Sequence, residues 1–88
     1  MIGRVNIIEE RLRAAFAPQD LQIVDESSKH IGHPGARDGG HYAVTIVSAK
    51  FAGVPTLSRH RLIYDTLSDL MTKDIHALSI HAYAPDER

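Results

Sequence analysis

The absence of cysteine most constrains how this chain can fold. With 88 residues, the chain has room for one domain and no more. Without cysteine, it can form neither a disulfide framework nor a thiolate metal site of its own. A modest hydrophobic core must therefore hold it together. We expect residues 1–88 to form a single domain in which amphipathic helices and strands pack against one another.

The spacing of apolar residues divides the first half of the chain into helical and extended segments. Helical periodicity over residues 5–17 predicts an amphipathic helix that ends at Pro18. Short β-branched stretches at 21–27 and 41–48 predict two strands, the second with clear alternation of large apolar residues. Glycine and proline make residues 29–40 a loop.

The second half of the chain predicts a further helix and strand. We expect the helix to begin near Thr56 or Ser58, either of which could be its N-cap, and to carry an apolar stripe as far as Met71. A last strand is predicted over residues 75–83. The order α-β-β-α-β favours an α+β domain with a three-stranded mixed sheet and helices on one face.

The connections predict which strand ends meet. One loop joins the first two strands, so they should be antiparallel neighbours, and the second helix should return the chain so that the third strand runs parallel to the second. The third strand then starts at the same end of the sheet as the glycine-rich loop. Four of the six histidines are expected to gather there: His30, His33, His41 and His76.

These histidines are the candidate metal ligands, because imidazole is the commonest protein ligand for metal ions. His76 shares alternation parity with Leu78 and Ile80, so we expect it to face the core side at the sheet rim. For any single histidine, the favoured interpretation is a rim residue that bonds a backbone carbonyl. A self-contained metal site is not expected without cysteine or an HExxH motif, and a partial site completed by a partner fits better.

Composition and motifs exclude several function classes. The formal net charge of −1 leaves no global basic field. The sequence contains no bilayer-length apolar run and begins without the pattern of a signal peptide, so we expect a cytoplasmic protein without membrane contact. It also has neither a Walker loop nor a nucleophile elbow, so we do not expect an enzyme.

The segment Arg59-His60-Arg61 lies at the start of the second predicted helix. The favoured interpretation is a packed His60 between two solvated arginines. The alternative is a nucleic-acid surface in which Arg59 and Arg61, with Lys50, contact phosphates.

Several segments together resemble the BolA family. They are DES at 25–27 followed by His30, GHPG at 32–35, HY at 41–42, FAG at 51–53, LSRHRLIY at 57–64 and IHAL at 75–78. This resemblance covers nearly the whole chain. It implies a fold similar to class II KH domains, α-β-β-α-α-β, with a short extra helical turn around residues 68–73.

The resemblance also implies a function. BolA-like proteins bind monothiol glutaredoxins, with glutathione, and share a [2Fe-2S] cluster with them in iron–sulfur trafficking or iron and redox regulation. His76 matches the signature cluster ligand and His30 the second ligand or regulatory residue, with His33 and His41 as alternatives. Because this chain has no cysteine, thiolates would come from the partner, and we expect the isolated chain to be a monomer without a cluster.

Some bacterial members of the family are transcriptional regulators of stress response and cell morphology. A DNA-binding regulator that uses Lys50, Arg59 and Arg61 is therefore the alternative function.

Overall fold

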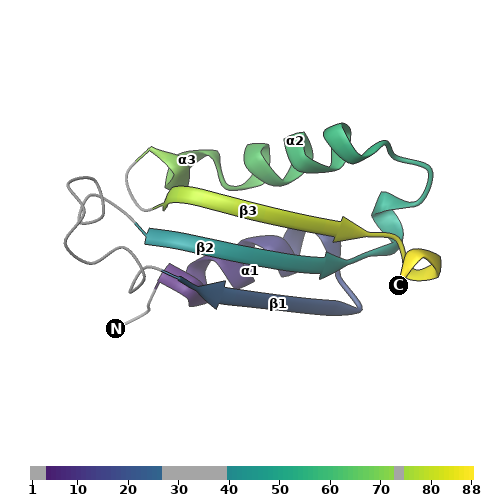
Figure 1. Ribbon diagram of the computed structural model, residues 1–88, viewed down its shortest axis with the longest axis horizontal. Coiled ribbons are helices and arrows are strands. Elements are labelled where there is room, and N and C mark those ends of the chain that lie inside the picture. Colours follow the sequence, from purple (N-terminus) through teal and green to yellow (C-terminus); the bar gives the residue numbers. More distant parts are fainter. Residues whose placement is uncertain (1–3, 27–39, 73–74) are drawn as a thin grey trace.

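The computed structural model describes residues 4–26, 40–72 and 75–88 (Figure 1). Its elements are α1 (Arg4–Phe16), β1 (Asp20–Asp25), β2 (Gly40–Val47), the 3₁₀ turn η3 (Ala49–Phe51), α2 (Thr56–Thr66), α3 (Ser68–Met71), β3 (Ile75–Tyr83) and the 3₁₀ turn η4 (Pro85–Glu87). The predicted order of helices and strands is confirmed. The short extra helix implied by the family resemblance is α3.

The three strands form one mixed sheet in the order β1-β2-β3. β1 and β2 are antiparallel, while β2 and β3 are parallel, as the connections predict. Figure 1 shows β2 between the other two strands, with α1 behind the sheet and α2 running alongside β3. The start of β3 therefore lies at the same end of the sheet as the start of β2.

The core lies between the helices and one face of this sheet. Along β2, Tyr42, Val44 and Ile46 are buried and alternate with partly exposed residues, which is the pattern of a strand with one covered face. The buried apolar residues that the helices add are Ile8, Leu12 and Phe16 from α1, Ile63 from α2 and Leu70 from α3. Their helical spacing is the signal from which the amphipathic helices were predicted.

The ends of β3 agree with the prediction, and those of the other elements differ from it by at most two residues. Pro55 is the N-cap of α2 and makes no side-chain hydrogen bond, so the prediction of Thr56 or Ser58 as N-cap is wrong. Pro55 itself is extended, with a ψ of 151°, and its carbonyl accepts the first helical hydrogen bond, from the N–H of Arg59 at 3.0 Å. α1 ends at Phe16, and Ala17 has a φ of 43°. Over the described residues, no helix is long and apolar enough to cross a membrane.

Candidate functional site

A register shift in the β2–β3 ladder places two histidines side by side. Gly40 pairs with Ile75, but the next residue, His41, pairs with Ala77, so His76 is an extra residue between two consecutive partners. Such a bulge redirects the side chain of the inserted residue. The ring centroids of His41 and His76 lie 4.9 Å apart, with the ring planes inclined at 46°.

The bulge also corrects the predicted orientation of His76. Alternation from Leu78 and Ile80 would place His76 on the core face, but Ile75 occupies the core there and is only 2% exposed. His76 is exposed instead. The prediction was wrong because counting alternate residues along a strand assumes that no residue is inserted by a bulge.

The histidine pair, His41 and His76, lies at an end of the sheet that solvent reaches. His41 is partly exposed and alternates with the buried Tyr42, so it belongs to the sheet face away from the helices. An open pocket beside it is lined by Glu26, His41, Tyr42, Ala77, Leu78 and Ser79. The backbone N–H of Glu26 donates to the carbonyl of His41 at 2.7 Å, which extends the β1–β2 ladder to this point.

The predicted gathering of four histidines is confirmed for His41 and His76. His30 and His33 lie outside the described residues. Within the described segments, no group of three or more histidine or acidic side chains is arranged to hold a metal ion. The site therefore offers two imidazoles and needs further ligands from elsewhere.

The chemistry of this donor set suits part of an iron–sulfur site. Such clusters are mostly held by thiolates, but histidine replaces two cysteines on one iron in some [2Fe-2S] centres. Imidazole nitrogens from this chain would fit that place, since the chain has no thiolate to offer.

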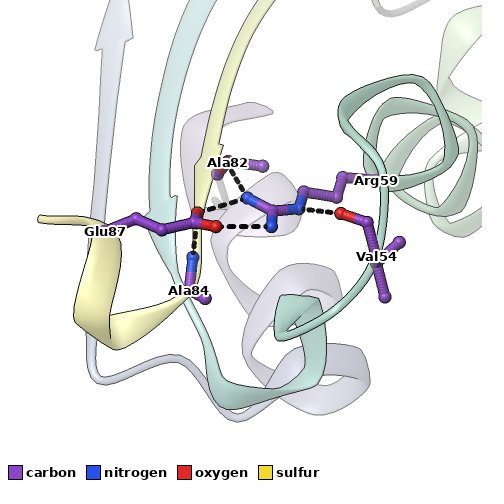
Figure 2. A network of polar contacts seen from close by, with 5 residues as sticks. All are labelled: Val54, Arg59, Ala82, Ala84 and Glu87. Carbon is purple, nitrogen blue, oxygen red and sulfur yellow. Dashed lines mark hydrogen bonds and ion pairs between the residues drawn. The ribbon is translucent and has the colours of Figure 1, made fainter.

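The second candidate region is the start of α2, where Arg59 is buried in a network of polar contacts (Figure 2). Its Nε donates to the carbonyl of Val54 at 2.7 Å, and its Nη1 donates to the carbonyl of Ala82 at 2.9 Å. Two further bonds, of 2.6 and 2.9 Å, reach the two carboxylate oxygens of Glu87. The same carboxylate accepts a bond from the backbone N–H of Ala84. The network thus ties α2 to the end of β3 and to η4.

Charge pairing in this network shifts both pKa values. The hydrogen bond from Arg59 and, after it, the one from Ala84 lower the pKa of Glu87 to about 2. The hydrogen bond to Glu87 raises the pKa of Arg59. The ion pair is therefore formed throughout the neutral pH range.

These contacts correct the interpretation of Arg59-His60-Arg61. Arg59, not His60, occupies the buried face of α2, while His60 is partly exposed and Arg61 is exposed. Arg59 lies four residues before Ile63, so helical spacing places both on the same buried face of α2. The prediction left Arg59 in solvent because arginine is charged.

The three predicted phosphate contacts have different surroundings. The Arg59 guanidinium would have to leave Glu87 to bind a phosphate. The Lys50 ammonium is exposed and donates to the carbonyl of Ala15 at 2.8 Å. Arg61 is exposed on α2. Of the three, Arg59 is held most firmly within the chain.

Comparisons with known proteins agree with the fold and with these segments. The family model described as BolA-like protein matches residues 12–87. The DNA-binding transcriptional regulator BolA of Escherichia coli is 45% identical over 80 residues, which are 91% of this chain and 74% of that protein. The chloroplastic protein BOLA1 of Arabidopsis thaliana is 38% identical over 97% of this chain and 56% of its own length.

A solved structure gives the same result in three dimensions. BolA1 from Arabidopsis thaliana superposes with a TM-score of 0.87 at 33% identity, covering 100% of this chain and 98% of that one. The α+β fold with a three-stranded mixed sheet is thereby confirmed against a known structure. The chain belongs to the BolA family.

Proposed function

We propose that this protein is an adaptor that binds a monothiol glutaredoxin and co-ligates a [2Fe-2S] cluster with it. The observation that carries the proposal is the exposed imidazole of His76, turned out of the core by a bulge at the end of the sheet. In this role, His76 supplies a nitrogen ligand and His30 assists. The work of such an adaptor is iron–sulfur trafficking or iron and redox regulation, without catalysis of its own.

The lack of cysteine supports a shared cluster rather than a private one. A chain without thiolates offers nitrogen ligands only. A glutaredoxin with bound glutathione would supply the thiolates. The isolated chain is then a monomer without a cluster, in the cytoplasm, and the complex is the functional species.

The test is to reconstitute a cluster with a monothiol glutaredoxin, glutathione and this protein. Visible absorption and circular dichroism report the ligands of the cluster, and size-exclusion chromatography reports the complex. We expect the His76→Ala variant to lose the spectrum of the mixed complex. The matched control is His81→Ala, because His81 is also an exposed histidine of β3 but pairs with Thr45, far along the strand from His41.

The outcomes separate the roles of the residues. If His76→Ala gives the same spectrum as the unchanged protein, His76 is not a ligand and the proposal fails. A spectrum altered by His30→Ala assigns His30 as the assisting residue. If no complex forms with any monothiol glutaredoxin tried, the adaptor function itself is wrong.

A second candidate is a DNA-binding regulator. The observation that favours it is the 45% identity to an Escherichia coli protein named as a DNA-binding transcriptional regulator. Arg61 and Lys50 are the exposed cations of the candidate surface, and each phosphate contact steepens the dependence of affinity on salt. Measured by fluorescence anisotropy, Arg61→Ala should weaken DNA binding and flatten the salt slope, whereas Arg13→Ala on α1 should do neither. Equal effects of the two changes would refute this surface.

A further inference from the structure

We propose that His41 and His76 form a binding site for a divalent transition-metal ion, such as Zn²⁺, in the isolated chain. The two imidazoles are brought together by the fold alone, before any partner or cluster is present. The inference does not depend on the glutaredoxin proposal, because it concerns an ion bound by this chain on its own.

The distance between the rings agrees with coordination of one ion by both. Zn–N bonds are about 2.0–2.1 Å long and an imidazole nitrogen lies about 1.1 Å from its ring centre, so two imidazoles on one tetrahedral ion have centres roughly 5 Å apart. The observed separation of the His41 and His76 centroids is 4.9 Å. The ring centres therefore already lie at the separation that coordination of one ion by both imidazoles requires.

The backbone fixes this separation. His41 and Ala77 are ladder partners, and His76 is the residue that the bulge inserts just before Ala77. On the other side, the N–H of Glu26 bonds the His41 carbonyl. The backbone of His41 is thus held by strands on both sides of β2 and that of His76 by β2, so little backbone freedom is lost when an ion binds, which favours binding.

The donor type limits which ions the pair selects. Imidazole suits Zn²⁺, Cu²⁺ and Ni²⁺, whereas Mg²⁺ and Ca²⁺ prefer oxygen ligands. His76 is exposed and His41 is partly exposed, so an ion can reach both rings. Two protein ligands leave the other positions of the ion to water or to a ligand from outside the described residues, so we expect modest affinity and one ion per chain.

The experiment is a titration of the metal-free protein with ZnCl₂ at pH 7.5, where imidazole is mostly neutral. Isothermal titration calorimetry gives stoichiometry and affinity, and NMR of the imidazole nitrogens identifies the rings that bind. We expect one ion per chain, with shifts at His41 and His76. His41→Ala and His76→Ala should each weaken Zn²⁺ binding about tenfold or more, as loss of a ligand requires.

Three controls make the result specific. His81→Ala should leave the affinity unchanged. The double variant with both His41 and His76 replaced should show no Zn²⁺ binding at this site, because it removes the remaining ligand of each single variant. Circular dichroism and the chemical shifts of β2 and β3 show whether each variant is folded. His41→Gln is a second variant that removes the imidazole but keeps a side chain of similar length, and it should weaken Zn²⁺ binding as His41→Ala does.

The opposing outcomes are equally definite. Binding that is weakened by His76→Ala and His30→Ala or His33→Ala, but not by His41→Ala, would move the site to other residues and overturn the inference. Equal small losses for His41→Ala, His76→Ala and His81→Ala would indicate scattered surface binding and would also overturn it. MgCl₂ in place of ZnCl₂ should give no shifts at either ring.

Discussion

Arg59 and Glu87 form a two-bonded ion pair that joins the start of α2 to the last residues of the chain (Figure 2). The bonds are 2.6 and 2.9 Å long, and the two side chains are 8% and 41% exposed. Arg11 and Asp69 make a second pair with the same two bond lengths, but their side chains are 41% and 59% exposed. These two ion pairs therefore have equal bond lengths and unequal burial.

This comparison predicts unequal effects on stability. Glu87→Gln should lower the thermal unfolding midpoint by several degrees, because it leaves the buried Arg59 charge without its carboxylate. Asp69→Asn should change the midpoint much less, since exposed ion pairs contribute little. Thermal denaturation followed by circular dichroism measures both. Equal changes in the two variants would show that burial of Arg59 does not set the strength of its pair.

The same pair predicts how stability depends on pH. The pKa of Glu87 is about 2 in the folded chain, against an ordinary value of 4.5. A lowered carboxyl pKa stabilises the fold above the unfolded-state value, and this contribution is lost as the pH falls from about 4.5 toward 2.

Urea denaturation at several pH values checks this dependence. Over that range, the unchanged protein should lose more stability than Glu87→Gln, and above pH 5 the difference between them should be constant. Identical pH profiles would contradict the assignment. Asp69→Asn should also reduce the loss at low pH, because the pKa of Asp69 is lowered as well, by its hydrogen bond from Arg11.

The sequence was sufficient to predict the sheet, the two main helices and the end of the sheet at which His41 and His76 meet. These features follow from apolar periodicity and from the handedness of connections, which act over many residues and tolerate local error. The packing of Arg59 was not predicted, because a charged residue is normally placed outside unless its partner is known. That partner, Glu87, is 28 residues later in the chain.

The contact between His41 and His76 was also beyond the sequence pattern. The predicted topology brought the two residues to one end of the sheet, but a single-residue bulge decides which way His76 points. A bulge depends on the fit of two strands to each other and to the core. At this position, Ile75 takes the buried place and Gly40 is its partner.

The end of α1 predicts a stabilising substitution. Ala17 has a φ of 43°, in the left-handed region that residues with a side chain avoid, and its N–H bonds the carbonyl of Arg13. Ala17→Gly should stabilise the fold by about 0.5–1 kcal/mol. The opposite change, Gly53→Ala, should destabilise the fold by about 1 kcal/mol, because Gly53 has a φ of 74°. No atom lies within 4 Å of an added Cβ, so this loss comes from the backbone conformation and not from a clash. Urea denaturation distinguishes these directions, and a loss of stability in Ala17→Gly would contradict the argument.

Gly40 predicts a link between packing and the histidine pair. A Cβ on Gly40 would overlap the ring of Tyr42, which is 3% exposed and has little room to move. Gly40→Ala should therefore destabilise the fold by about 1–3 kcal/mol, the usual effect of overpacking.

The overlap should also displace the residues next to Gly40, where the register shift begins. We expect the imidazole NMR signals of His41 and His76 to move in Gly40→Ala, while those of His81 stay in place. In a Tyr42→Leu background, which removes the ring, Gly40→Ala should destabilise less than in the unchanged chain. The same loss in both backgrounds would mean that the ring of Tyr42 is not what requires glycine at this position.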